Sequence, residues 1–251
     1  MRIALGLEYD GSRFLGWQTQ PGGGAVQDAL ELALGAIAGA PVAVSCAGRT
    51  DRGVHAREQV VHFDTEAMRP QPAWVRGVNA FLPDSVAVLW SREVAGDFHA
   101  RYSATARIYR YVLLNRPVRP ALQGPYLGWF HLPLDAQAMR EAALLLVGEH
   151  DFSAFRSAEC QAKSPVRAIH AFHINHAGEN IEFVVRANAF LHHMVRNLVG
   201  TLVYVGKGKH PAGWVKEVLE SRDRARAAPT FGPEGLYLEK VEYEARWGLP
   251  Q

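Results

Sequence analysis

The 251-residue sequence has few of the features that mark specialised classes of protein. It contains two cysteines, Cys46 and Cys160, which are too few for a disulfide framework and show no paired metal-ligand spacing. No apolar run approaches the roughly 18 residues that span a bilayer. The first ten residues alternate like a strand and do not resemble a signal peptide. We therefore expect a globular protein of the cytoplasm.

Acidic residues are also missing from one long segment, although the net charge of the whole chain is only +2. Between Asp97 and Asp135 there is none, and arginines and aromatic residues alternate there: Arg101, Tyr102, Arg107, Tyr109, Arg110, Tyr111, Arg116, Arg119, Tyr126, Trp129 and Phe130. Guanidinium groups bind phosphates and aromatic rings stack on unpaired bases, so the segment is typical of RNA contact. The same aromatic residues could equally form part of the core.

Hydrophobic periodicity indicates a mixture of strands and helices. The first part of the chain predicts strands at 3–9, 42–47, 58–64 and 86–94, with helices at 26–37 and 72–81. The second part predicts a strand at 107–114, a helix at 135–147, a hairpin of 167–175 and 181–187, helices at 190–205 and 212–220, and a strand at 236–243. The order β-α-β-β-α-β nearly repeats. We therefore predict an α+β protein of two ferredoxin-like halves, with a mainly antiparallel sheet joined across a central active-site cleft.

The predicted boundary between the halves lies near Ala106. Residues 1–106 form the expected N-terminal half with the aspartate loop described next, and residues 107–251 form the expected C-terminal half.

Asp51 lies in an eleven-residue stretch, CAGRTDRGVHA, that holds one carboxylate among two arginines, two glycines and a histidine. Apolar runs flank the stretch, so it reads as a loop between two strands in which Gly48 and Gly53 allow backbone angles closed to other residues. An acid beside cations stays ionised at neutral pH. Such a carboxylate can be a nucleophile, a general base, a metal ligand or an anchor for its own turn.

Two other segments have less chemical content. The glycine-rich loop after Tyr9 carries Trp17 and has the character of a contact loop, but it lacks the lysine and hydroxyl residue of a phosphate-binding loop. The adjacent His192 and His193 have no partner at the spacing that completes a zinc pair on a helix. The sequence therefore predicts neither a nucleoside triphosphate site nor a metal site.

Taken together, the motifs resemble those of the TruA-type tRNA pseudouridine synthases over nearly the whole chain. The matching segments are YDG at 9–11, GWQ at 16–18, AGRTD at 47–51, GVHA at 53–56, VVHF at 60–63, FHAR at 98–101, SATAR at 103–107, YRY at 109–111, HDFSAF at 150–155, FLHHMVRN at 190–197 and PEGLYL at 233–238. One departure is Arg52, where the family usually carries a small residue.

The resemblance implies that uridine is isomerised to pseudouridine at positions 38, 39 and 40 in the anticodon stem-loop of tRNA. It also implies a homodimer and a reaction without a metal or an organic cofactor. In that reaction the N1–C1′ bond breaks, the uracil turns, a C5–C1′ bond forms and the C5 proton leaves. Glycosidases use two carboxylates and a water, whereas an isomerase must keep water out, so a single carboxylate in a closed pocket suits it.

The resemblance also implies a role for each site residue. Asp51 is the catalytic residue, acting as a nucleophile at C1′ or at the base ring, or as the base that removes the C2′ proton. Four residues bind the substrate: Arg196 pairs with Asp51, Tyr109 stacks on the uracil, Arg49 helps to extrude the nucleotide and Leu236 supplies an apolar wall.

Two rival functions use the same residues. One is a noncatalytic RNA-binding or RNA-chaperone module that has the same cleft. The other is a glycosidase-like or metal-assisted hydrolase built on Asp51, which needs a second acid or metal ligands. Neither Glu58 nor the histidines supply a suitable set.

Overall fold

The computed structural model describes residues 1–250, which form two compact units. Residues 1–107 and 237–250 make up the first unit, and residues 108–236 make up the second. The predicted boundary near Ala106 lies next to the first crossing, but the prediction assigned all of 107–251 to the second half. Residues 237–250 belong to the first unit instead, because Tyr237 and Leu238 pair in parallel with His55 and Ala56 there.

The first unit contains the predicted β-α-β-β-α-β order. Its elements are β1 (Arg2–Tyr9), α1 (Val26–Ala38), β2 (Ser45–Cys46), β3 (His55–Asp64), a π-helical turn (Ala73–Gly77), β4 (Val86–Val94) and, apart from its first residue, β10 (Leu236–Tyr243). Strand β1 lies between β4 and β3 and is antiparallel to both, and β2 pairs antiparallel with β3. The order β4-β1-β3-β2 is that of the split βαβ motif.

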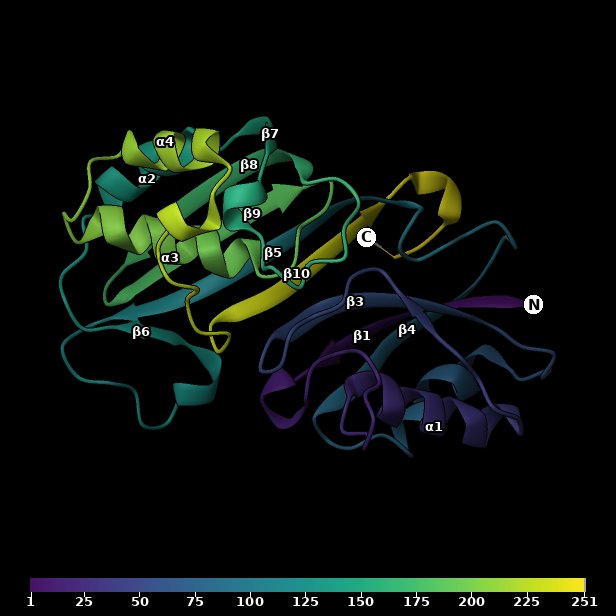
Figure 1. The fold of residues 1–251 in the computed structure, drawn as a ribbon. Coiled ribbons are helices and arrows are strands. Elements are labelled where there is room, and N and C mark those ends of the chain that lie inside the picture. Colours follow the sequence, from purple (N-terminus) through teal and green to yellow (C-terminus); the bar gives the residue numbers. More distant parts are fainter. Residues whose placement is uncertain (251) are drawn as a thin grey trace. The chain divides into compact units, whose positions relative to one another are not determined.

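Helix α1 covers one face of this sheet (Figure 1). Its buried residues are Val26, Leu30, Ala33 and Leu34, which recur at helical spacing as predicted. The helix ends at Gly39, which adopts the left-handed conformation at φ 75° and donates its N–H to the carbonyl of Gly35. The amphipathic pattern of the sequence thus accounts for this helix from its first residue to its end.

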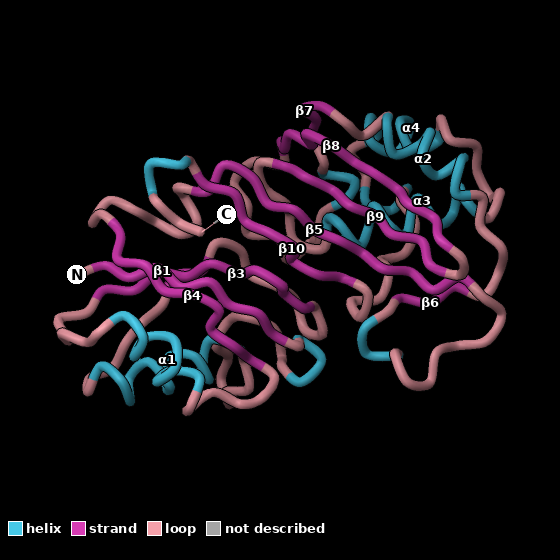
Figure 2. Tube along the Cα trace, turned by 180° about the vertical axis from the view of Figure 1, so that it is seen from behind, coloured by secondary structure: helices cyan, strands magenta, loops and turns pink. Residues whose placement is uncertain are grey.

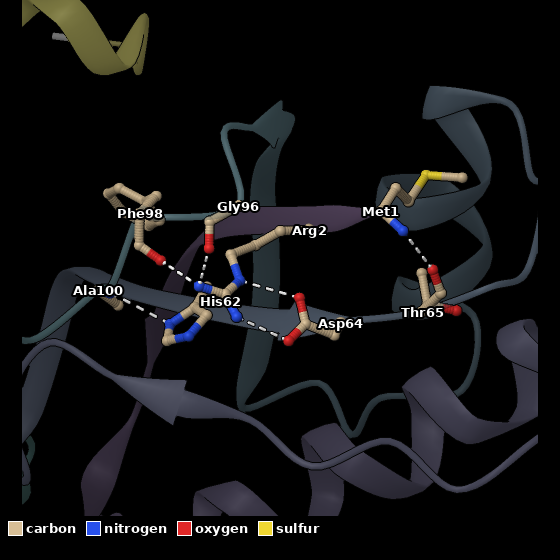
Figure 3. A network of polar contacts seen from close by, with 8 residues as sticks. All are labelled: Met1, Arg2, His62, Asp64, Thr65, Gly96, Phe98 and Ala100. Carbon is tan, nitrogen blue, oxygen red and sulfur yellow. Dashed lines mark hydrogen bonds and ion pairs between the residues drawn. The ribbon is translucent and has the colours of Figure 1, made fainter.

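A network of polar contacts joins the start of β1, the end of β3 and the segment that follows β4 (Figure 3). The guanidinium of Arg2 donates to both carboxylate oxygens of Asp64, at 2.9 and 2.7 Å, and to the carbonyls of Gly96 and Phe98. His62 accepts the N–H of Ala100 at Nδ1. These bonds fix the segment after β4 against β1 and β3, and so position the residues that lead into the next strand, which begins at Ala104.

The second unit has a sheet and three helices. Its elements are β5 (Ala104–Asn115, of which Ile108 onward belongs here), β6 (Gly128–Phe130), α2 (Ala136–Leu144), β7 (Gly148–Asp151), β8 (Val166–Ala177), β9 (Asn180–Ala187), α3 (Met194–Gly206) and α4 (Trp214–Ser221). The strand order is β5-β9-β8-β7, with β6 parallel to β5. The predicted hairpin is β8–β9, and Gly178 in its turn has φ 60°.

The three helices lie on one face of the second unit's sheet. They lie in front of its strands in Figure 1 and behind them in Figure 2. Helix α3 is the central one, since eleven of its thirteen residues are buried. The expected α+β class and mainly antiparallel pairing are therefore confirmed. None of the helices within residues 1–250 is long and apolar enough to cross a membrane.

Candidate active site

The predicted aspartate loop connects β2 to β3 in the first unit. The two strands pair antiparallel through Ser45 with His62 and Cys46 with Val61, so the loop has the position that the sequence predicts. Gly53 has φ 80° and the N–H of Val54 donates to the carbonyl of Asp51, which closes a tight turn. Gly48 does not have a positive φ.

Two buried polar side chains hold the start of the loop. Gln59 is completely buried, and its side-chain amide donates to the carbonyl of Gly48 at 2.6 Å and accepts the N–H of Gly48 at 3.4 Å. The guanidinium of Arg107 donates to the carbonyls of Ala47 and Arg101 at 2.9 and 2.6 Å. Buried backbone groups are expensive to leave unpaired, so these bonds restrict the loop to one conformation.

A second set of contacts fixes Thr50, immediately before the aspartate. Its hydroxyl lies 2.8 Å from that of Tyr9, and its carbonyl accepts the N–H of Trp17 at 3.0 Å. Gly16 has φ 110°, and a Cβ there would lie 3.0 Å from the same carbonyl. The glycine-rich loop therefore supports the backbone next to Asp51, which is the physical reason for a glycine at position 16.

A third set fixes the end of the loop. The N–H of Gly11 donates to Nδ1 of the buried His55 at 3.1 Å. A Cβ on Gly11 would collide with the carbonyl of Val54. Asp51 is partly exposed in the middle of the loop, whereas Arg49 and Arg52 are exposed. The backbone is thus fixed on both sides of a carboxylate, which is the preorganisation that a catalytic group requires.

Cys46, at the end of β2, is a poor candidate for a catalytic nucleophile. Burial raises the pKa of its thiol to about 11, so the thiol is protonated at neutral pH and is a poor nucleophile. Asp51 therefore remains the reactive group of interest in this part of the chain.

In the second unit, Tyr109 lies on β5 and is buried. Its ring meets that of Phe190 edge to face, with centroids 5.0 Å apart and planes at 80°. Phe190 belongs to the loop before α3, in which His193 takes the left-handed conformation at φ 61°. This contact sets the orientation of the tyrosine ring.

Arg196 lies in the first turn of α3 and makes reciprocal contacts with Phe231. Its Nε donates to the carbonyl of Phe231 at 2.8 Å, and the N–H of Phe231 donates to the carbonyl of Arg196 at 3.2 Å. The next residue, Asn197, is fully buried and binds the carbonyl of Phe155 and the side chain of Thr230. The direction of the Arg196 guanidinium is therefore set by segment 230–231.

Leu236, the first residue of β10, is buried and follows a closely packed turn. The carbonyl of Gly235 accepts the N–H of Val112 on β5, and a Cβ on Gly235 would collide with the carbonyl of Val112. The hydroxyl of Tyr111 donates to the carbonyl of Gly232 at 3.0 Å. Only glycine lets the backbone at position 235 lie this close to Val112, which is a structural reason for the glycine in the PEGL motif.

Segment 231–236 therefore links three of the predicted site residues within the second unit. It binds Arg196 at one end, precedes Leu236 at the other, and packs on the strand that carries Tyr109. Asp51 and Arg49 belong to the first unit. Their meeting with the other three, including the ion pair of Asp51 with Arg196, stays a prediction.

The acid-free arginine-aromatic segment does not form one RNA-binding face. Arg107 is a buried brace, and Arg110 and Arg116 form ion pairs with Glu182 and Glu179 at 3.0 and 3.2 Å. Tyr109 and Tyr111 are buried, as the alternative of core packing predicted. Arg101, Arg119, Tyr102 and Trp129 are exposed. The segment therefore divides between structural and surface residues.

Sequence analysis missed the residues that hold the aspartate loop from a distance, above all Gln59 and Arg107. Gln59 is one of several polar residues in β3, and Arg107 is one arginine among many, so neither stands out in the sequence. Both act through bonds to the backbone of residues far along the chain, which a linear pattern does not display.

The comparisons with known proteins agree over most of the chain. A family model described as tRNA pseudouridine synthase matches residues 7–103 and 142–244. Proteins named tRNA pseudouridine synthase A from Dechloromonas aromatica, Methylobacillus flagellatus and Aromatoleum aromaticum are each 60% identical to this chain over 250 residues. These alignments cover 100% of the chain and 95%, 96% and 95% of the three relatives.

Proposed function

Because the chain belongs to the tRNA pseudouridine synthase family, we propose that it isomerises uridine to pseudouridine at positions 38, 39 and 40 in the anticodon stem-loop of tRNA, with Asp51 as the catalytic residue. The observation that carries the assignment of Asp51 is the loop itself. Before the carboxylate, the loop is held by the bonds of Gln59 to Gly48 and of Tyr9 to Thr50, and after it by the turn in which Val54 donates to the carbonyl of Asp51. The family assignment disfavours the noncatalytic RNA-binding alternative.

The chemistry suits a single fixed carboxylate. The glycosidic bond breaks, the detached uracil turns without leaving, C5 bonds to C1′, and the C5 proton is released. A rigid loop holds the carboxylate in place without reorganisation as charge develops at C1′. The proposed reaction uses neither a metal nor an organic cofactor.

The proposed substrate contacts follow the family resemblance. Tyr109 stacks on the uracil, Arg196 pairs with Asp51, Leu236 forms an apolar wall, and Arg49 assists extrusion of the nucleotide from the stem. The packing of the buried Tyr109 on Phe190 and the hydrogen bond of the partly exposed Arg196 to the carbonyl of Phe231 support these roles, because both side chains are held in defined orientations.

The proposal is tested by mapping pseudouridine in tRNA transcripts that carry uridine at only one of positions 38, 39 and 40, after incubation with the purified protein. We expect pseudouridine at each of the three positions and at no uridine outside the anticodon stem-loop. Modification elsewhere in the tRNA, with none at these positions, would contradict the proposed substrate site.

A homodimer is also proposed, from the family resemblance. Sedimentation equilibrium of the same preparation should then give about twice the 27.7 kDa mass of the chain.

A cytoplasmic location is also proposed, from the composition of the chain and the nature of its substrate. Cell fractionation that placed the protein with membranes would contradict it.

A further inference from the structure

A group of lysine and aromatic side chains gathers at the C-terminal end of α3, the opposite end of the helix from Arg196. We call it the lysine-aromatic cluster; its members are Phe130, Tyr204, Lys207, Lys209, His210 and Trp214. All six belong to the second unit. Lys207 and Lys209 are two of only five lysines in the chain, so their position together is unusual for this sequence.

Both ammonium groups lie over the same aromatic ring. Nζ of Lys207 is 3.8 Å and Nζ of Lys209 is 4.5 Å from the centroid of Tyr204, and Lys207 is also 5.9 Å from that of Phe130. The ring of His210 stacks on that of Trp214 at 3.9 Å, with planes 16° apart. Cation–π contact and stacking thus hold two positive charges close together at the surface.

The turn that ends α3 places both lysines next to the ring of Tyr204. The N–H of Lys209 donates to the carbonyl of Tyr204, and the N–H of Gly208 donates to that of Val205, which is the hydrogen-bond pattern of a Schellman motif. Gly208 has φ 74°. The partial negative charge at the C-terminus of a helix favours a nearby cation, but it does not by itself account for two lysines over the ring of Tyr204.

The segments that carry the cluster are poor in acidic residues. Asp135 lies next to the end of α3, where its N–H donates to the carbonyl of Gly206, and its carboxylate accepts the N–H groups of Gln137 and Ala138 in the first turn of α2. The sequence has no acidic residue between Glu182 and Glu217, and residues 129–131 lie in the acid-free segment between Asp97 and Asp135. Within residues 1–250, no carboxylate forms an ion pair with either lysine. Two such ammonium groups, close together and beside aromatic rings, suit a polyanion whose phosphates are regularly spaced.

We infer that the lysine-aromatic cluster binds the phosphate backbone of tRNA at nucleotides other than the uridine that reacts. Lys207 lies eleven positions after Arg196, just past the end of α3, which corresponds to about 16 Å along a helix. The inference rests on the proposed function, since it assumes that tRNA is the substrate. It adds a second point of contact, which positions the RNA but takes no part in the bond changes.

The test measures the dissociation constant of unmodified full-length tRNA over a series of salt concentrations. In the double variant Lys207→Ala, Lys209→Ala, we expect binding to weaken on the order of tenfold near physiological salt. The plot of log affinity against log salt should become shallower by about 1.4 to 1.8, since each lost phosphate contact removes roughly 0.7 to 0.9. The double variant Lys207→Arg, Lys209→Arg keeps the charges and should bind nearly as wild type.

The matched control is Lys163→Ala, Lys216→Ala, which removes two charges from exposed positions in the same unit. It should leave the salt dependence unchanged. An unaltered salt dependence in Lys207→Ala, Lys209→Ala, or an equal loss in the control, would overturn the inference.

Mapping of pseudouridine with wild-type protein separates the two proposals. If pseudouridine forms at 38–40 and the cluster variant binds normally, only the inference about the lysine-aromatic cluster fails. If the cluster variant binds weakly but wild type modifies none of these positions, only the proposed function fails.

Discussion

At the scale of single residues, His62 shows how burial determines a charge state. The side chain is 6% exposed, and burial, followed by the nearby charges of His99 and Arg2, lowers its pKa to about 4. Asp64 opposes this shift. The neutral ring is the form that accepts the N–H of Ala100 at Nδ1 (Figure 3).

The depressed pKa of His62 predicts a pH-dependent stability. An unfolded histidine titrates near 6.5, so the unfolded chain binds a proton before the folded one as the pH falls. The contribution of His62 is complete above pH 6.5 and is lost between 6.5 and about 4, by up to about 3 kcal/mol. Urea unfolding at several pH values should show this loss in wild type and a smaller one in His62→Gln. His99 and Asp64 titrate in both proteins, so identical profiles would contradict the assignment to His62.

The residues that sequence analysis could identify are those whose role is local. The aspartate loop was predicted from its flanking apolar runs, and Gly53 confirms the need for a special backbone angle. Gln59 and Arg107 could not be predicted, since their partners, Gly48 and Ala47, are brought to them by folding. The candidate role of Asp51 came from the family motifs, because residue chemistry alone left four alternatives open.

At the scale of elements, the β2–β3 loop depends on side chains from the strands and loops around it. Gln59 on β3 makes two bonds to the backbone of Gly48. Asn79 makes the same pair of bonds to the backbone of Val88, elsewhere in the first unit. The two amides therefore offer a matched comparison between a bond pair at the loop and one away from it.

In Gln59→Leu, the N–H and carbonyl of Gly48 lose their partner, which should cost about 1–3 kcal/mol of unfolding free energy. We expect the single-turnover rate of isomerisation at saturating tRNA to fall as well, since Asp51 is no longer held in one position. Asn79→Leu should lose comparable stability yet keep its rate. Equal slowing of both variants, at a temperature where both are folded, would mean that Gln59 acts only through overall stability.

Elements whose apolar residues recur at a regular spacing were predictable from the sequence. Elements that depend on tertiary contacts were not. Helix α1 and the β8–β9 hairpin follow from apolar spacing and a glycine turn. The π-helical turn at Ala73–Gly77 has no such signal and was expected as an ordinary helix. The parallel pairing of β10 with β3 depends on residues nearly two hundred positions apart, which a local pattern does not contain.

At the scale of the whole molecule, the two units differ from the predicted halves because the C-terminal residues, from Tyr237 onward, belong to the first unit. Strand β10 carries Leu236 in the second unit and continues into the first, so the two units share two chain crossings. The arginines are likewise divided: some brace the fold, as Arg107 does, and others stay exposed. A nearly neutral protein can therefore still present localised positive charge to RNA.

The central claim is that Asp51 carries out the isomerisation. It is tested most directly by the release of tritium from tRNA labelled at C5 of uridine, measured in a single turnover with Asp51→Asn, alongside Asp84→Asn as an exposed control. We predict that Asp51→Asn still binds tRNA but releases tritium at least on the order of a hundredfold more slowly, whereas the control matches wild type. Tritium release by Asp51→Asn at the wild-type rate would contradict the account.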